Sequence, residues 1–236
     1  MSNQIQEISA VRAALSPARI ATYEAAAGRQ APDDPAALLL YGWNAEVSGA
    51  LLSPLHVCEV VIRNAVAETL EKLYGAQWPW SQTFVQSLPN PLKGYSPRQD
   101  LFSARRKAQT AGQVIPELKF VFWQKMFTRR YDVRIWEPHL YQVMPNLDTT
   151  QPVAASRLSV YHDLERVRLL RNRIAHHEPI FARQLNDDYQ TIHRLITYRC
   201  TTTAAWLNAI QKVTATIANR PTGTRPWPAP HTRLPI

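Results

Sequence analysis

The sequence predicts an all-α fold, on the evidence of its helix start signals, its apolar periodicity and its lack of strand alternation. Ser-Pro and Asp-Pro pairs, which place a capping side chain before a proline in the first helical turn, recur along the chain. Apolar residues between these pairs follow helical spacing, and the alternation of a half-buried strand is almost absent. Since 45% of the residues are hydrophobic, a helical bundle with a sizeable core is expected.

Start and stop signals delimit the helices of the first half of the chain. A Ser-Pro pair opens a helix over 16–28, and an Asp-Pro pair opens a long segment over 34–75 that ends at a glycine. Pro54 lies inside this segment, and an interior proline removes a backbone donor, so we expect two helices there. Another Ser-Pro pair opens a helix over 96–112.

The second half of the chain continues in the same way. A helix over 117–131 carries aromatic residues at helical spacing, which we expect in the core. These aromatic residues are Phe120, Trp123, Phe127 and Tyr131. Further helices are expected over 133–143, 156–177, 186–198 and 202–218, with a polar loop over 146–155.

The composition predicts one helical domain over residues 1–219, followed by a flexible tail. The last seventeen residues, 220–236, hold five prolines and no apolar period. The amino-terminal residues carry no secretory leader, and no run of about eighteen apolar residues is present, so we expect a cytoplasmic protein with no membrane contact. Cys58 and Cys200 stand apart, with no Cys/His cluster around them.

The charge balance favours a polyanionic partner. Lys and Arg total 27 against 18 Asp and Glu, a formal net charge of +9. Phosphate contacts reward such a surplus through counterion release, so nucleic acid is the indicated partner. A basic protein without such a partner stays open as the alternative. The basic runs 105–107 and 129–130 are expected to be solvated first and to contact phosphate second.

The segment 165–179 carries the chemistry. On a helix, Leu164, Val167, Leu170 and Ile174 form an apolar arc, whereas Glu165, Arg168, Asn172 and His176 form a polar stripe. Arg171 lies at the edge of the apolar arc, about 140° around the helix from His176. Pro179 ends the helix and leaves His176 and His177 in its final turn, where the helix dipole favours imidazolium.

These residue types suit cleavage of an RNA phosphodiester. His176 can take a proton from a ribose 2′-hydroxyl or protonate the leaving oxygen. Arg171 can hold two phosphate oxygens and stabilise the charge that grows on phosphorus. Asn172, one turn before His176, can orient it. No metal or other cofactor is needed when the 2′-hydroxyl is the nucleophile, and the products are a 2′,3′-cyclic phosphate and a 5′-hydroxyl.

The string Arg171-Asn172-x-x-x-His176 resembles the Arg-x4–6-His motif of HEPN ribonucleases. The surrounding sequence, residues 170–181, resembles their Abi-like branch, which is named for abortive infection. Landmarks elsewhere agree over roughly residues 35–210. They are Glu59-x-x-x-Arg63-Asn64, Phe120-x-Phe122-Trp123, Phe127, Trp136 and Ala205-Trp206-Leu207.

The resemblance implies an HEPN-like helical bundle with additional helices that forms a homodimer, in which both copies of the motif line one cleft. It implies an endoribonuclease with a toxin or antiviral role. Many relatives pair with an antitoxin or another inhibitory partner, and others stay inactive until they are triggered; both arrangements stay open for this chain. Whether tRNA, mRNA or phage RNA is the target stays open.

Further residues are candidates for supporting roles. Glu59 and Arg63 interrupt an apolar stretch at i, i+4 spacing, with His56 one turn earlier, so we expect a paired network that faces the Arg/His helix. Asn64 and Arg168 are further candidates for supporting roles. His177 is open between a phosphate contact and an exposed helix end.

The same residue types have competing uses. Arg171 could instead form an ion pair with Glu165 or Glu59. The histidines lack metal-ligand spacing, and no strand-turn-helix serine motif of a hydrolase occurs. A non-catalytic RNA-binding or protein-interaction module is the main alternative function. A regulatory subunit that senses infection is a third.

Overall fold

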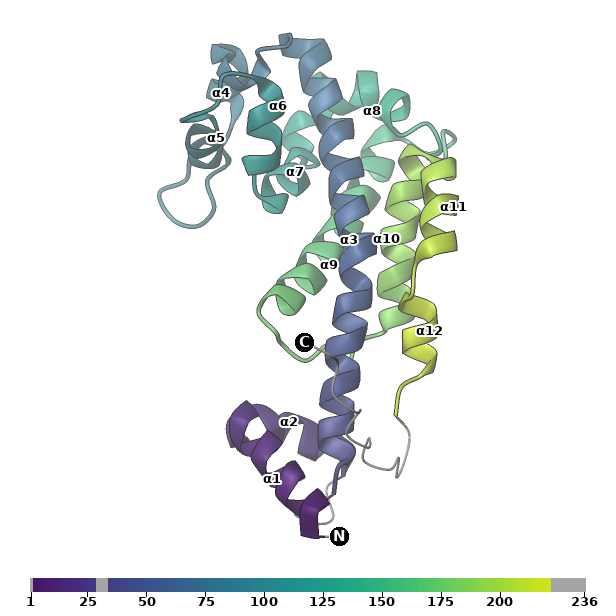
Figure 1. Cartoon of the computed structure of the whole chain (residues 1–236). Coiled ribbons are helices and arrows are strands. Elements are labelled where there is room, and N and C mark those ends of the chain that lie inside the picture. Colours follow the sequence, from purple (N-terminus) through teal and green to yellow (C-terminus); the bar gives the residue numbers. More distant parts are fainter. Residues whose placement is uncertain (1, 29–33, 222–236) are drawn as a thin grey trace.

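The computed structural model describes residues 2–28 and 34–221, and the regular elements over these two ranges are all helical. The all-α prediction is therefore confirmed. The 39-residue helix α3 (Ala36–Tyr74) runs through the molecule as its spine (Figure 1). The other helices form three groups around it.

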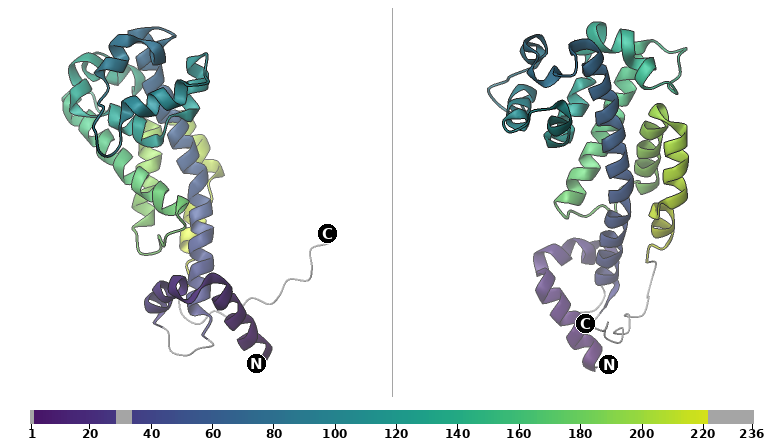
Figure 2. Two further views of the ribbon diagram at one scale, coloured as in Figure 1. Left: turned by 90° about the vertical axis from the view of Figure 1, so that its left-hand side faces the viewer. Right: turned by 45° about the horizontal axis from the view of Figure 1, so that its top comes forward.

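The amino-terminal hairpin, α1 (Ser2–Leu15) and α2 (Pro17–Ala27), lies at the end where α3 begins (Figure 2). A lobe of short helices follows the other end of α3. It consists of η1 (Trp78–Trp80), α4 (Gln82–Ser87), α5 (Pro97–Arg105), α6 (Ala111–Val114), η2 (Ile115–Glu117) and α7 (Phe120–Met126). The third group begins with η3 (Arg129–Tyr131), η4 (Asp132–Trp136) and α8 (Glu137–Val143). It continues along α3 with α9 (Val153–Ala175), α10 (Leu185–Arg199), α11 (Thr201–Ile210) and α12 (Val213–Ala218).

Helix α3 continues through Pro54, so the predicted division of this segment into two helices is wrong. An interior proline lacks the N–H that would donate to the preceding turn, at a cost of about 3 kcal/mol. Pro54 is itself buried, and α3 also buries Leu51, Leu55 and Ile62 around it. Each large apolar side chain stabilises by about 1.5–3 kcal/mol when buried, so tertiary packing outweighs the missing hydrogen bond.

Three other predicted helices are divided. The 96–112 segment forms α5 and α6, the 117–131 segment forms α7 between two 3-10 turns, and the 202–218 segment forms α11 and α12. An amide side chain stands at two of these breaks. The Gln113 oxygen accepts the Gln109 N–H at 2.8 Å, and the Gln211 oxygen accepts that of Thr214 at 3.1 Å. Such bonds satisfy backbone donors that a continuous helix would have satisfied itself.

The predicted start and stop signals of α2 and α3 are confirmed. Ser16 accepts a hydrogen bond from the first turn of α2, and Gly28 ends that helix with a φ of 64°. The Asp34 carboxylate accepts the backbone N–H of Ala36 at 2.8 Å, and α3 ends at Gly75. These contacts satisfy donors that have no partner within the helix.

The aromatic residues predicted for the core are buried. Phe120, Trp123, Phe127 and Tyr131 are all at most 5% exposed. Trp136 stacks on Phe127 with 4.3 Å between ring centroids. Aromatic side chains thus join the α4–α7 lobe to the helices that follow it.

A buried ion pair anchors the start of α9. Arg157 donates from Nε and Nη2 to the Asp132 carboxylate at 2.8 and 2.9 Å, and from Nη1 to the Phe127 carbonyl oxygen at 3.3 Å. Buried charges are tolerated only where hydrogen bonds complete their pairing. This bidentate pair therefore fixes α9 against the turn at η4.

Helix α3 is also the one described helix that is long and apolar enough to cross a membrane, with a mean hydropathy of 1.4 over its most apolar stretch. The central helix of a packed bundle meets the same test, and α2, α10 and α12 pack against α3. The predicted Pro-rich tail, 220–236, lies from residue 222 onward outside the described residues.

Candidate functional site

Helix α9 presents its two faces as its periodicity predicts. The apolar arc is buried, and its members are Leu164, Val167, Leu170 and Ile174. Arg171 is exposed, whereas Asn172 is partly buried. The packed arc fixes which side of α9 faces the core, so the polar residues leave the helix on its other faces.

Ion pairing distinguishes one arginine of α9 from the other four. The pairs are Arg157 with Asp132, Arg166 with Asp188, Arg168 with Glu165 and Arg173 with Glu178, at 2.7 to 3.1 Å. No residue in the described part of the chain forms an ion pair or hydrogen bond with the side chain of Arg171. The ion pair with Glu165 or Glu59, which the sequence left open for Arg171, is therefore not formed there. Arg171 is free to contact an anion.

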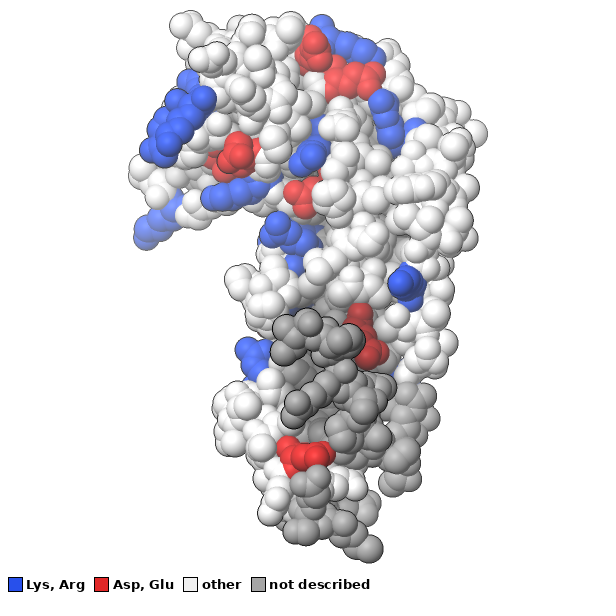
Figure 3. All heavy atoms as spheres, viewed as in Figure 1, with Lys and Arg blue, Asp and Glu red and all other residues white. Residues whose placement is uncertain are grey.

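Arg171 and Asn172 lie on the wall of a cleft of about 430 Å³ between α9 and the α4–α7 lobe. Its other lining residues are Glu59, Tyr95, the segment 116–121 and Arg168. We call it the Arg171 cleft. Figure 3 shows Lys and Arg side chains bordering the hollow beneath the lobe, with carboxylates among them.

A polar network includes Arg168, one of the residues that line this cleft. Glu165 accepts two hydrogen bonds from Arg168, at 2.7 and 2.8 Å, and one from Gln124 Nε2 at 2.7 Å. The bonds from Arg168 lower the pKa of the Glu165 carboxyl, against burial, which raises it. The same pairing raises the pKa of Arg168. The predicted supporting role of Arg168 thus has a geometric basis in the wall of the cleft.

The predicted pairing of Glu59 with Arg63 is wrong. No ion pair joins them in the described structure. Glu59 instead lines the Arg171 cleft, while the Nε of Arg63 is buried without a hydrogen-bond partner among the described residues. Asn64 is exposed. Helical spacing places the two charges on one stripe, but that spacing does not produce an ion pair between them.

Helix α9 ends in a Schellman turn. The Glu178 N–H donates to the Arg173 carbonyl at 2.8 Å, and the His177 N–H donates to the Ile174 carbonyl at 3.0 Å. The two histidines were predicted in the final helical turn, which is wrong. His176 is the C-cap, and His177 follows it in the left-handed region, with a φ of 54°. This conformation reverses the chain toward α10.

His176 and His177 are exposed and line a second hollow, of about 400 Å³. The amino-terminal hairpin forms its other wall with Ser16, Arg19 and Thr22. We call it the His176 pocket. Arg19 Nη1 donates to the His177 carbonyl oxygen at 2.8 Å. Ser16, with a φ of 68°, and His177 are the two non-glycine residues of positive φ among those described, and both line this pocket. Backbone strain of this kind collects at functional sites.

One chain does not bring Arg171 and His176 together. Arg171 lines the cleft on the side of the α4–α7 lobe, whereas His176 lines the pocket beside the amino-terminal hairpin. Asn172 lies with Arg171, and within the described residues its side chain makes no hydrogen bond to His176; its carbonyl oxygen accepts the His176 backbone N–H at 2.9 Å. Within a single chain, therefore, no hydrogen bond from the Asn172 side chain to His176 supports the predicted orienting role.

Two residues of this region went unrecognised in the sequence. Arg19 precedes the motif by more than a hundred residues and carries no signal that could have linked it to His177. Asn44 is 6% exposed, and its Oδ1 accepts the N–H groups of Ile180 and Phe181 at 2.8 and 3.1 Å. A lone asparagine within an apolar helical segment was the available signal for Asn44.

Among the described residues, no group of three or more His, Cys, Asp or Glu side chains is arranged to hold a metal ion. Comparison with known proteins finds no matching family model, no matching curated protein and no matching solved structure. The resemblance to Abi-like HEPN ribonucleases therefore stays a prediction, and the geometry around α9 is what bears on function.

Proposed function

We propose that this chain is a metal-independent endoribonuclease that uses Arg171 on α9 and His176 at the C-cap of that helix. The observation that carries the proposal is the state of Arg171. It is exposed on the wall of a cleft and has no partner among the described residues, while the other arginines of α9 are each engaged by a carboxylate. A structural arginine is held by a carboxylate or a carbonyl oxygen, whereas an arginine that binds phosphate must be available to it.

The chemistry follows from the two groups. The ribose 2′-oxygen attacks the neighbouring phosphorus as its proton passes to the neutral imidazole of His176, and the resulting imidazolium then protonates the 5′-oxygen as the bond between that oxygen and phosphorus breaks. The guanidinium of Arg171 holds two phosphate oxygens while charge grows on them. A histidine whose pKa lies near neutrality can serve either step.

A second copy of the chain completes the site in this proposal. Five residues along a helix correspond to a rise of about 7.5 Å and a rotation of about 140°, so Arg171 and His176 of one α9 face different surroundings. In a homodimer, Arg171 of one copy and His176 of the other can reach the same phosphate. This arrangement agrees with the shared cleft that the family resemblance implies.

The biological setting that we propose also follows the resemblance: a cytoplasmic toxin or phage-defence effector, kept inactive by a partner or a trigger. His177 is proposed as a further contact to phosphate, because its strained backbone holds an imidazole where glycine or asparagine is usual.

The test is cleavage of a labelled mixed-sequence RNA in EDTA, with the product ends identified. We expect the wild type to leave a 2′,3′-cyclic phosphate, and we expect His176→Ala and Arg171→Ala to lose about 100-fold or more in rate while their melting curves stay unchanged. DNA of the same sequence should stay intact because it lacks the nucleophile.

Matched controls lie on the same helix. His162 and Arg173 are exposed, and we expect their alanine variants to cut RNA as the wild type does. Cleavage that survives in both site variants contradicts the assignment. Tight RNA binding without any cleavage by the folded wild type favours the non-catalytic RNA-binding module instead.

A further inference from the structure

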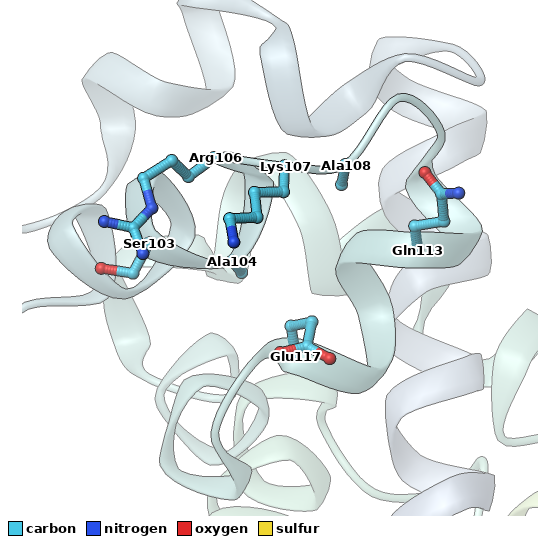
Figure 4. Close-up of a pocket in the computed structure, with 7 residues that line it drawn as sticks. All are labelled: Ser103, Ala104, Arg106, Lys107, Ala108, Gln113 and Glu117. Atoms are coloured by element: carbon cyan, nitrogen blue, oxygen red, sulfur yellow. The ribbon is translucent and has the colours of Figure 1, made fainter.

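A third hollow lies in the α4–α7 lobe and joins the Arg171 cleft through one shared residue. It measures about 390 Å³ and is lined by Ser103, Arg106, Lys107, Gln113, Glu117 and two alanines (Figure 4). We call it the lobe pocket. Glu117 also lines the Arg171 cleft, and Lys119 stands in that cleft two residues farther on. A strand of RNA whose phosphate meets Arg171 would therefore reach this pocket with a neighbouring nucleotide.

The charged groups of the lobe pocket are not paired with one another. Arg106, Lys107 and Glu117 are all exposed, and none forms an ion pair or hydrogen bond through its side chain with any residue that the structure describes. Arg105, in the same basic run, is engaged: its Nη1 donates to the Pro79 carbonyl oxygen at 2.8 Å. Two unpaired cations and one unpaired carboxylate around one hollow match a ligand that carries both an anion and hydrogen-bond donors.

Gln113 adds a donor of defined orientation. Its side-chain oxygen accepts the Gln109 backbone N–H at 2.8 Å, which leaves the amide NH2 as its unengaged end. In Figure 4, Lys107 and Glu117 approach the open space from opposite sides, with Ala104 and Ala108 beside them. The pocket thus offers cations for a phosphate, an acceptor and a donor for a base edge, and small apolar groups against which a base can lie.

Guanine satisfies this set best among the RNA bases. A carboxylate has two acceptor oxygens, and guanine alone presents two adjacent N–H donors on its Watson–Crick edge. Its O6 then accepts from Lys107 or the Gln113 amide. Building on the proposed function, we propose that the lobe pocket is a nucleotide subsite, in which Glu117 selects guanine next to the cleavage point and Arg106 and Lys107 bind its phosphate.

The test separates binding from cleavage. Labelled hexanucleotides with 2′-O-methyl riboses cannot be cut, because the nucleophile is blocked, and fluorescence anisotropy gives their dissociation constants with the full-length protein. We expect one guanine in a uridine background to strengthen binding roughly tenfold over adenine or cytosine at that place. Glu117→Gln should abolish this preference, while Glu71→Gln, an exposed carboxylate at the end of α3, should keep it.

The cations are tested by salt dependence. The double variant Arg106→Ala/Lys107→Ala should weaken binding of every sequence. Log affinity falls as log salt rises, and the variant should make this negative slope less steep by about 1.4. The matched control Lys93→Ala/Lys212→Ala removes the same charge at exposed positions that line none of the three hollows, and it should leave the slope unchanged.

The outcomes distinguish this inference from the proposed function. RNA that the wild type cleaves but binds without guanine preference overturns the subsite and leaves the nuclease standing. Guanine-selective binding that depends on Glu117, without any cleavage of unmodified RNA, supports the subsite and overturns the nuclease. Equal binding by the Glu117→Gln variant and the wild type for every sequence also overturns the subsite.

Discussion

Arg19 donates a hydrogen bond across 2.8 Å to the carbonyl oxygen of His177, a residue 158 positions farther along the chain. This contact attaches the amino-terminal hairpin to the turn that ends α9. The hairpin lies outside the span that resembles the HEPN family, yet it forms one wall of the pocket that His176 lines. One wall of the pocket at the proposed catalytic histidine therefore comes from outside that span.

Complementation tests whether two copies share one site. We expect Arg171→Ala and His176→Ala, each inactive alone, to regain RNA cleavage when they are co-expressed, because a mixed dimer holds an intact Arg171 opposite an intact His176. Co-expression of Arg171→Ala with the double variant is the control and should stay inactive. Mixed dimers that form but do not cleave contradict the shared site.

His177→Gly tests the strained turn. A non-glycine residue in the left-handed region costs about 1 kcal/mol or more, so the variant should melt about 2–4 °C higher than the wild type. We expect it to cleave RNA several-fold more slowly, because the imidazole is gone. The same change at His162, inside α9, should lower the stability by about 1 kcal/mol. Higher stability with full activity reduces His177 to a structural role.

Asn44→Ala tests what holds the chain that follows the motif. The Ile180 and Phe181 N–H groups lose their acceptor in a buried place, so the free energy of unfolding should fall by about 2–3 kcal/mol. Urea unfolding measures this loss. Asn64→Ala, exposed on the same helix, is the control and should change the free energy by less than about 0.5 kcal/mol. Equal effects of the two variants would be evidence against the anchoring role of Asn44.

Glu165→Gln tests the network behind the Arg171 cleft by its pH dependence. The pKa of the Glu165 carboxyl is lowered in the folded protein, chiefly by hydrogen bonds from Arg168. Because the pKa is lower in the folded protein, the ionised carboxylate contributes its full stabilisation of the fold at pH values above the pKa of the unfolded chain, about 4.3. This stabilisation is lost as the pH falls through the pKa of the folded protein. The difference in Tm between wild type and variant should therefore be largest near about pH 7 and should shrink below about pH 4. A difference that does not change with pH contradicts the pairing.

The sequence by itself determined the helical class, the limits of α2 and α3 and the buried faces of α7 and α9. These features depend on local signals: a capping serine or aspartate, a glycine beyond the last turn, and apolar residues at a period of 3.6. It also marked Arg171 and His176, because both stand in one short string on one helix, and it placed them on different sides of that helix.

Only the tertiary structure decided what surrounds these groups. It carried α3 unbroken through Pro54, placed Glu59 in the wall of the Arg171 cleft, left Arg171 without a partner among the described residues, and brought Arg19 to the His177 turn. Packing between segments far apart in the chain produces each of these features. In α3, for example, the free energy gained by burying apolar side chains outweighs the cost of a proline inside the helix. The spacing of residues in the sequence predicts the face of a helix on which a side chain lies. The partners of that side chain belong to other elements of the fold, which the spacing does not predict.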